Sequence, residues 1–354
     1  MSAHPIAYFQ PVVDLRGRGV VAVEALARLM LADGRVLTPA AFLDGMSAQS
    51  RRDLSREMLR QGLALLARLD AQGISLGLSF NVDADFILDA DCVHCFRDLV
   101  DASGIDPGRI TLEILESGEF LTTESALELM RALREAGARI ALDDVGSAYS
   151  SLLRLKELPI DRIKLDQAFV RDLAQGPDNL VFVMALQSLA QGLDVELIVE
   201  GVETPAMLDA MIALGVDSVQ GYALARPMPA DQLAAWMIDG AITPHRNDRQ
   251  PDTLLGAYAA HLRQRALMDS IIREGTFVHV LDVIHDCPLV RYLSAQGMRN
   301  DHPLLQIHQR IVHIFHGRRR LIDLETSDTN LMAAEQHLAR LVADALSAEA
   351  AVSC

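Results

Sequence analysis

Short β-rich runs alternate with amphipathic helical stretches from Ala7 to about Ala241, and this alternation constrains the fold more than any other feature. Eight runs have the composition expected of buried strands: Tyr8–Asp14, Gly19–Leu26, Leu76–Val82, Arg109–Ile114, Arg139–Asp143, Arg162–Leu165, Glu196–Val199 and Ser218–Tyr222. Helix-like segments between them repeat apolar residues every three or four positions: Leu54–Leu69, Thr123–Ala136, Asn179–Gln191 and Thr204–Leu214. About eight such repeats predict a mostly parallel sheet closed into a TIM-type (β/α)8 barrel.

A second unit of different composition is expected after the barrel. The polar segment 244–252 contains two prolines and predicts a linker. Beyond it the pattern is helical, with four helices expected at Leu254–Arg273, Phe277–Leu293, Pro303–Ile322 and Asn330–Leu346. Nine of the 11 histidines lie from His245 onward. We therefore expect an α/β barrel over residues 1–243 and a small all-α, His-rich bundle over residues 253–354.

Charge and hydrophobicity exclude several classes of function. The formal net charge is −16, whereas binding to nucleic-acid polymers or anionic membranes requires clustered Lys and Arg. No run approaches the roughly 18 apolar residues of a membrane span, and the first residues lack a signal-peptide pattern. Four cysteines are too sparse for a disulfide scaffold. We expect a cytoplasmic protein without membrane insertion.

Polar side chains follow the strand-like runs, at the ends where a parallel barrel places its active site. They are Glu24, Asn81, Glu113, Asp143, Asp144, Lys164, Asp166, Glu200, Glu203 and Gln220. A single carboxylate at a strand end is a helix cap or a surface group about as often as it is a functional residue. Five or more on one rim would repel one another strongly unless cations neutralised them. Carboxylates with one amide favour Mg2+ or Mn2+ over Zn2+, and two such ions suit phosphodiester hydrolysis.

The same residues resemble a known family. Glu24-Ala25-Leu26, followed by Ala27-Arg28, is similar to the signature of the EAL-domain cyclic di-GMP phosphodiesterases. Further motifs occur in the family's order. QPV precedes this signature at 10–12, and after it come Asn81, LEILES at 112–117, DDVGSAYSSL at 143–152, LPIDRIKLD at 158–166, VEGVET at 199–204 and QGYALARPMP at 220–229. The resemblance covers roughly residues 5–240. It implies an enzyme that hydrolyses the bacterial second messenger cyclic di-GMP to linear pGpG with Mg2+ or Mn2+. It also implies a homodimer.

The resemblance also implies a role for each residue at the rim. One metal ion would be held by Glu24, Asn81, Glu113 and Asp143, and the other by Asp143, Asp144 and Glu200. Lys164 and Glu200 would assist the attacking water. Gln10 and Arg28 would contact the substrate or nearby backbone, and Asp166, Glu203 and Gln220 would orient ligands and water. Glu116 would anchor the loop 144–150, which helps to form the family's dimer interface.

Departures from the family pattern are mild. Val145, Ser147 and Ala148 stand where Phe, Thr and Gly are common, and Leu29 replaces a common aromatic residue. Ala148 narrows the backbone conformations of its loop. No metal-ligand position is lost, so we predict an active enzyme. The competing interpretation is a catalytically inactive receptor that binds cyclic di-GMP without cleaving it.

The C-terminal region suggests a second metal site. The run from His285 through Cys287 to Leu293 resembles the core of the chemoreceptor zinc-binding (CZB) domain, a helical bundle whose Zn2+ is held by His, Cys and a His pair four apart. His261 and Cys287 would match the first two ligands. Helix periodicity favours His313 with His316, three apart, as the pair, with His308 as the alternative. With zinc bound, this domain is expected to regulate the barrel as a zinc or oxidant sensor. Without zinc, the bundle would serve dimerisation or dock another protein.

Neither a redox or metal site at the CxxC pair nor a cyclase activity is expected. Cys92 and Cys95 have CxxC spacing, but no second cluster lies nearby in sequence, so we expect them on a barrel helix in a structural role. The chain has no motif of the GGDEF-type cyclases, so synthesis of cyclic di-GMP is expected elsewhere.

Overall fold

The computed structural model describes residues 3–17, 19–87, 89, 91–115, 123–146, 155–171, 173, 176–238, 250–273, 287–318 and 324–352. They form two compact units. The first comprises residues 1–167, 187–202 and 217–245, and the second comprises residues 168–186, 203–216 and 246–354. The last boundary falls close to the expected linker. The second unit, however, also includes two segments from within the predicted barrel sequence.

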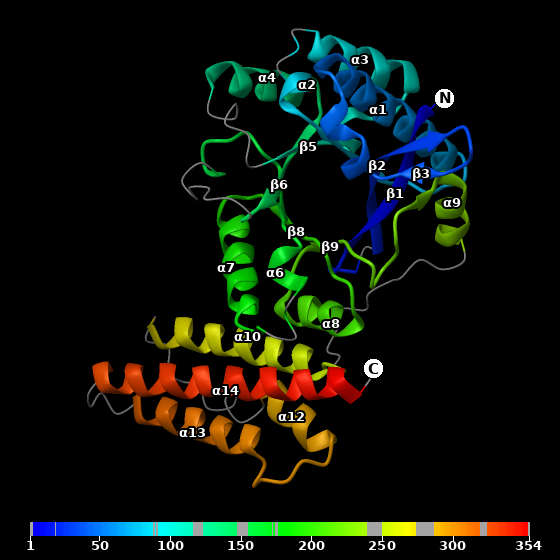
Figure 1. Ribbon diagram of the computed structural model, residues 1–354. Coiled ribbons are helices and arrows are strands. Elements are labelled where there is room, and N and C mark those ends of the chain that lie inside the picture. The colour runs from blue at the N-terminus through cyan, green and yellow to red at the C-terminus, as the bar shows by residue number, and fades with distance from the viewer. Residues whose placement is uncertain are drawn as a thin grey trace. The chain divides into compact units, whose positions relative to one another are not determined.

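Eight strands close a ring in the first unit (Figure 1). Around the ring they are β1 (Ala3–Asp14), β2 (Gly19–Leu31), β4 (Gly77–Val82), β5 (Ile110–Leu115), β6 (Arg139–Val145), β7 (Arg162–Leu165), β8 (Glu196–Val199) and β9 (Ser218–Val219). Two short strands, β3 (Val36–Leu37) and β10 (Met228–Pro229), extend the sheet. The predicted TIM-type barrel is confirmed.

One strand departs from the parallel arrangement. β1 runs antiparallel to both β2 and β9, whereas the neighbours from β2 round to β9 are parallel. Only four residues separate Asp14 from Gly19, and parallel pairing would need a crossover of about a dozen residues. The β1–β2 connection is therefore a hairpin rather than a strand–helix–strand unit.

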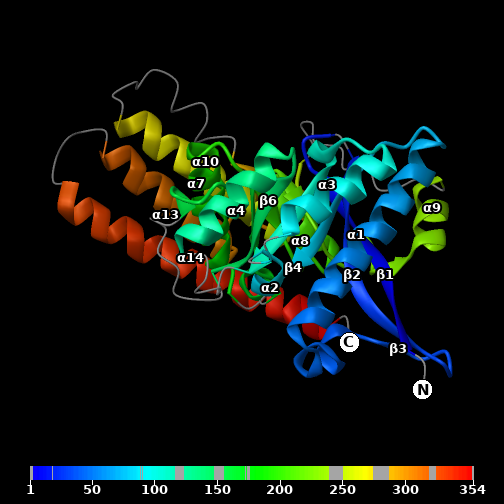
Figure 2. The same ribbon diagram turned by 90° about the horizontal axis from the view of Figure 1, so that it is seen from above.

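Helices cover the outside of the ring in the first unit (Figures 1 and 2). They are α1 (Ala48–Asp70), α2 (Ala84–Ile87), α3 (Cys92–Ser103), α4 (Glu124–Glu135) and α9 (Ala230–Ile238), with short 3-10 turns at 39–41, 43–45 and 107–109. Phe80 on β4 packs edge-to-face against Phe86 on α2, with ring centroids 6.4 Å apart. Because side chains alternate along a strand, Ser79 and Asn81 point to the opposite, inner face.

The second unit is helical. It contains α6 (Ala168–Arg171), the first part of α7 (Asn179–Gly192), α8 (Pro205–Leu214), α10 (Leu254–Arg273), α12 (Pro288–Ala295), α13 (Pro303–Arg318) and α14 (Leu324–Val352). α10 packs against α8, α12 and α14, and α13 packs against α14 and α12. Residues 277–286 and 319–322 of the expected helices lie outside the described residues, and α14 is longer than expected. No helix in the described part of the chain is long and apolar enough to cross a bilayer.

Candidate functional site

Polar side chains from neighbouring strands meet inside the rim of the barrel. Glu24 on β2 is the register partner of Gln10 on β1, and Asn81 on β4 is the partner of Glu113 on β5. Glu24, Glu113 and Gln10 are buried, so water does not satisfy them and they need partners within the protein. Each lies at an inward position of its strand, between outward apolar neighbours that pack under the helices.

A hydrogen-bond network joins these side chains around Glu24. The Asn81 amide donates to Glu24 Oε1 at 2.8 Å and to Glu113 Oε2 at 3.4 Å. The Gln220 amide donates to Glu24 Oε2 at 2.8 Å and to Gln10 Oε1 at 3.1 Å. The Gln10 amide in turn donates to the Ala225 carbonyl at 3.1 Å. The sequence prediction that these positions converge is met by direct contact.

Lys164 on β7 is the buried cation that the carboxylates of the rim share. Its Nζ lies 2.6 Å from Glu200 Oε1, 2.8 Å from Glu113 Oε2, 3.2 Å from Glu24 Oε2 and 3.4 Å from Asp143 Oδ1. Burial opposes the charge on the ammonium, but the surrounding carboxylates raise the pKa of Lys164 well above its ordinary value. Lys164 is therefore charged at neutral pH.

One lysine does not balance the negative charge of the cluster. Burial and the neighbouring Glu24 charge raise the pKa of Glu113 well above its ordinary value. Burial, with repulsion from Asp143 and Glu24, raises the pKa of Glu200 to about 7. Burial, with repulsion from Asp143 and Asp166, raises the pKa of Asp144 to about 6. Raised pKa values at several adjoining carboxyls show that this site favours additional positive charge.

A break in the strand register brings two adjacent aspartates to the same rim. The pairing of β6 with β7 shifts between Leu142 and Val145. Asp144, within the shift, has a left-handed backbone with φ of 57°, and its amide donates to Asp143 Oδ1 at 3.0 Å. In a regular strand, neighbouring side chains would point to opposite faces. Here, ligand atoms of Asp143, Asp144 and Glu200 all lie within 4.8 Å of one another.

This oxygen donor set fits divalent cations. Mg2+ binds oxygen ligands at about 2.0–2.1 Å in octahedral geometry, so opposite ligands of one ion lie about 4.2 Å apart. The three acidic groups around Asp144 therefore need only small movements to share an ion. Hard, oxygen-only ligands also disfavour the softer metals that prefer sulfur or imidazole.

The remaining predicted residues differ in their placement. Arg28 on β2 donates to the Ala27 carbonyl at 2.8 Å, and its guanidinium lies 5.5 Å from the centre of the Tyr8 ring. Asp166 follows β7 and hydrogen-bonds to Asp144. Glu203 belongs to the second unit, just before α8. Glu116 and its loop partners at 147–150 lie outside the described residues.

The sequence analysis missed an aromatic–cation pair in the 220–229 motif. The Arg226 guanidinium lies 4.2 Å from the centre of the half-exposed Tyr222 ring. An aromatic residue directly after Gly221, with an arginine four residues later, was the available signal. Such a pair offers a flat, positively charged surface beside Gln220.

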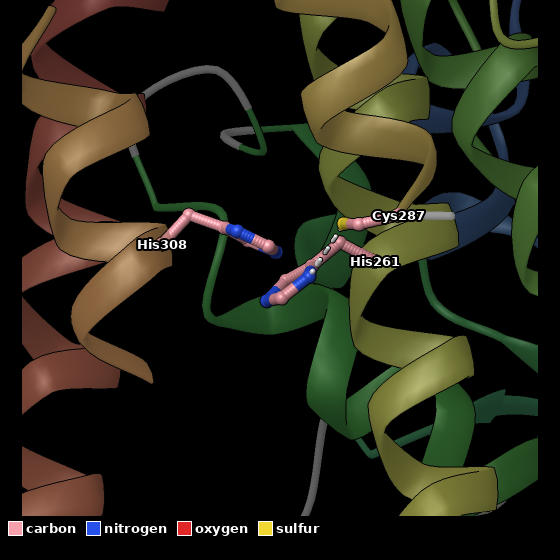
Figure 3. Close-up of side chains that lie close together, drawn as sticks. All are labelled: His261, Cys287 and His308. Carbon is pink, nitrogen blue, oxygen red and sulfur yellow. Dashed lines mark hydrogen bonds between the residues drawn. The ribbon is translucent and has the colours of Figure 1, made fainter. Parts of the chain in front are cut away.

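A second cluster lies in the helical unit, where Figure 3 shows the side chains of His261, Cys287 and His308 turned toward one another. They come from α10, the start of α12 and α13, and all three are buried. His261 Nδ1 lies 3.3 Å from Cys287 Sγ, and the two histidine rings are 5.3 Å apart at their centroids. One ligand atom from each residue lies within 4.8 Å of the others.

The two histidines of this cluster are neutral, which is the form that binds metals. Burial lowers the pKa of His261 to about 3 and that of His308 to about 4. His308, the predicted alternative to the His313–His316 pair, is the α13 histidine of this cluster. His313 is exposed on α13, and the side chain of His316 lies outside the described residues.

The CxxC pair lies on α3, as expected. Cys92 is buried, and burial raises the pKa of its thiol to about 12. His94 faces Asp98 one turn along the same helix, at 3.4 Å, rather than Cys92. Among the described residues, no group of three metal-binding side chains close to one another includes Cys92 or Cys95.

Comparison with known proteins identifies the family to which the barrel belongs. Residues 3–227, more than half of the chain, match the EAL domain. The chain belongs to the EAL domain family. It is 37% identical over 224 residues to the cyclic di-GMP phosphodiesterase RocR of Pseudomonas aeruginosa, covering 63% of this chain and 57% of the relative. The chain spans between about a third and just over half of the curated relatives that it matches first.

Solved structures of EAL proteins resemble the barrel as well. The MucR phosphodiesterase of P. aeruginosa in complex with c-di-GMP has a TM-score of 0.60 and 30% identity, over 65% of this chain and 94% of that one. Klebsiella pneumoniae BlrP1, in a calcium and cyclic di-GMP complex, has a TM-score of 0.56 and 25% identity, over 63% and 56% of the two chains. The family match ends at residue 227, so the CZB resemblance of the C-terminal helices stays a prediction.

Proposed function

We propose that this chain hydrolyses cyclic di-GMP to linear pGpG with two Mg2+ or Mn2+ ions. The observation that carries the proposal is the buried carboxylate cluster around Lys164, at the strand ends of an EAL barrel. RocR is named a cyclic di-GMP phosphodiesterase, and the MucR structure is a c-di-GMP complex. The BlrP1 complex contains calcium together with cyclic di-GMP, which supports a role for a divalent cation in dinucleotide binding.

The donor groups divide into two overlapping sets. Glu24, Asn81, Glu113 and Asp143 would hold one ion, and Asp143, Asp144 and Glu200 the other. Asp143 is common to both because it lies between the Glu24 network and the Asp144 turn. Ions bound there would lower the pKa of a water molecule and neutralise charge on the phosphodiester.

Protein groups would position and deprotonate that water. Glu200 accepts a hydrogen bond from Lys164 and lies beside Asp143 and Asp144, so its carboxylate would be in place to accept the proton of that water. Lys164 would hold Glu200 in place and offset charge on the phosphate. Gln220 and Asp166 would orient Glu24 and Asp144, to which they are hydrogen-bonded.

Substrate contacts would come from the β1–β2 side of the rim. Gln10 is held beside Glu24 through Gln220, and Arg28 lies over the Tyr8 ring farther along β2. A guanidinium and an amide in these places would bind phosphate oxygens or nearby backbone. Glu203 and Glu116 keep the orienting and loop-anchoring roles that the family resemblance implies.

The receptor alternative makes a different prediction from the enzyme. We expect wild type to form pGpG only with Mg2+ or Mn2+, and Glu24→Ala to lose at least about 100-fold in rate, as expected for loss of a catalytic group. Ion-exchange chromatography of the nucleotides measures both. Nucleotide binding by the wild type without pGpG formation would establish the receptor function instead.

The homodimer and the cytoplasmic location remain part of the proposal. The homodimer follows from the family resemblance, and the cytoplasmic location from the sparse cysteines of the chain. Light scattering after size-exclusion chromatography would test the dimer, and cell fractionation would test the location. A monomer at micromolar concentration would contradict the first expectation.

We propose a second function, Zn2+ binding by His261, Cys287 and His308. Tetrahedral Zn2+ binds sulfur at about 2.3 Å and nitrogen at about 2.0–2.1 Å, which separates two such ligands by about 3.5 Å. The observed distance of 3.3 Å between His261 Nδ1 and Cys287 Sγ is close to this value. Burial of all three side chains, with both histidines neutral, supports the same assignment.

Metal content distinguishes this site from a metal-free bundle that dimerises or docks a partner. Purified wild type is expected to contain one Zn2+ per chain by inductively coupled plasma mass spectrometry. Cys287→Ser should lose most of it, while the matched variant Cys92→Ser, at another buried cysteine, should keep it. Equal zinc in all three proteins would contradict the assignment of Cys287.

A further inference from the structure

A carboxylate on α8 holds the start of α10. Asp209 Oδ2 accepts hydrogen bonds from the Asp252 amide at 3.0 Å, the Thr253 amide at 2.9 Å and the Thr253 hydroxyl at 2.7 Å. A Cβ on Gly256 would lie 2.1 Å from this oxygen, so only glycine leaves room for it. The Thr253 hydroxyl also accepts from the Gly256 amide at 3.0 Å, which caps α10. We call the Asp209–Thr253 contact the clamp.

The clamp is one end of a continuous α8–α10 contact. Farther along α10, Arg263 donates to the Ala213 carbonyl on α8 at 2.9 Å. Between the two polar contacts, α10 buries Leu255, Tyr258 and Leu262. Close packing of this kind transmits small displacements because it leaves few voids to absorb them. A movement of α10 therefore displaces α8.

The proposed zinc ligand His261 lies on this same helix. It follows Thr253 by eight residues, about 12 Å along the axis. Its ring lies 6.2 Å from that of Tyr258, measured between centroids, and both residues are buried. Zn2+ held by His261, Cys287 and His308 would join α10 to α12 and α13, so metal binding would restrict the movement of α10.

The polypeptide chain itself connects α8 to the barrel strands. Thr204 caps α8 and follows Glu200 by four residues. Within the barrel unit, the Val202 amide donates to the Gln220 carbonyl at 3.1 Å, and the Ala223 amide donates to the Val202 carbonyl at 2.9 Å. A displacement of the segment that leads into α8 would therefore also displace the backbone of Glu200 and Gln220.

We infer that the clamp couples Zn2+ binding at the helical cluster to nucleotide binding at the barrel rim. The inference rests on both proposed functions and adds a route between them. Coupling of binding equilibria is reciprocal, so each ligand must change the affinity of the other by the same factor. Asp209 and Thr253 are positioning residues in this account, because neither belongs to either metal cluster.

The test measures binding in the full-length chain. Zn2+ affinity is determined by competition with a chromogenic chelator, with and without cyclic di-GMP in Ca2+ buffer, and cyclic di-GMP affinity with and without Zn2+. In wild type we expect both affinities to change by the same factor, about fivefold or more. Asp209→Ala should reduce the factor to below about twofold, with Zn2+ still bound and basal hydrolysis unchanged.

Two further variants control for general loss of structure. Thr253→Ser keeps the hydroxyl and the amide, so it should keep the coupling. Asp231→Ala removes an exposed carboxylate that pairs with Arg68 on the barrel unit, and it should leave the coupling at its wild-type value. Full coupling in Asp209→Ala, or none in wild type that binds both ligands, would overturn the inference and leave both proposed functions standing. Wild type without Zn2+ binding, or without nucleotide binding, would instead overturn the corresponding proposed function and the coupling with it.

Discussion

Lys164 Nζ lies 2.6 Å from Glu200 Oε1, and this contact joins the ends of two adjacent parallel strands, β7 and β8. The same ammonium reaches the carboxylates of Glu24, Glu113 and Asp143 on β2, β5 and β6. One buried cation thus holds together acidic groups from across the barrel rim. Burial and mutual repulsion raise the pKa values of Glu113, Asp143 and Glu200, so this cation compensates the acidic charge only in part.

Removing the charge of Lys164 should affect both stability and rate. Lys164→Met leaves several buried carboxylates without a cation, and breaking a buried ion pair costs about 3–5 kcal/mol. We expect a similar loss of unfolding free energy in chelator-treated protein, measured with urea. The hydrolysis rate should fall about 10²–10⁴-fold. The exposed Lys156→Met is the control, and equal behaviour of the two variants would contradict the role of Lys164.

The left-handed backbone of Asp144 should lower the stability of the protein, while its side chain is needed for activity. Asp144 and Asp194 both have φ of 57°, a left-handed conformation that costs a non-glycine residue about 1 kcal/mol or more. Asp144→Gly and Asp194→Gly should each raise the unfolding free energy by about 1 kcal/mol. Only Asp144→Gly should abolish pGpG formation. If Asp144→Gly kept more than half of the wild-type rate, the second metal set would need another ligand.

Gly221 should tolerate no side chain. A Cβ there would lie 2.2 Å from the Val202 carbonyl oxygen and 2.4 Å from its amide nitrogen, both of them backbone atoms. Gly221→Ala should therefore lower the melting temperature and weaken the attachment of Gln220 at the rim. Gly192→Ala, which meets nothing within 4 Å, is the matched control. It should be neutral or stabilising by about 0.5–1 kcal/mol. Equal melting temperatures for the two variants would contradict the close approach at Gly221.

Glu196 should stabilise the barrel in a pH-dependent manner. Burial opposes its ionisation, but Arg162 at 3.0 Å and the Ser218 hydroxyl at 2.8 Å hold the pKa of Glu196 below its ordinary value of 4.5. The folded state therefore favours the carboxylate, and its contribution is complete above the unfolded pKa and lost as the pH falls through the folded pKa.

The matching variant is Glu196→Gln, compared with wild type by urea unfolding between pH 7 and pH 4. At pH 7 the variant should be less stable by about 1.5–3 kcal/mol, the value of hydrogen bonds to a charged group. The difference should narrow below about pH 5, because only the wild type gains a proton there. A difference that stays constant across this range would show that the carboxylate charge is not responsible.

The barrel and most of its rim could be predicted because strand periodicity determines which side chains share a face. Glu24, Glu113 and Lys164 lie where their strands place them. The antiparallel β1 and the turn at Asp144 were not predictable, because both depend on local backbone geometry rather than on apolar spacing. His308 was disfavoured for a related reason. Periodicity identifies residues on a common helix face but not the face of α13 that meets α10.

A Mn2+-loaded crystal structure tests most directly whether the rim of the barrel holds two metal ions. Anomalous scattering should show two ions about 3.5–4 Å apart, the spacing of two-metal hydrolases. Glu24, Asn81 and Glu113 should hold one, Asp144 and Glu200 the other, with Asp143 between them. A single ion, or none with Lys164 still bound to all four carboxylates at saturating Mn2+, would contradict the two-metal account.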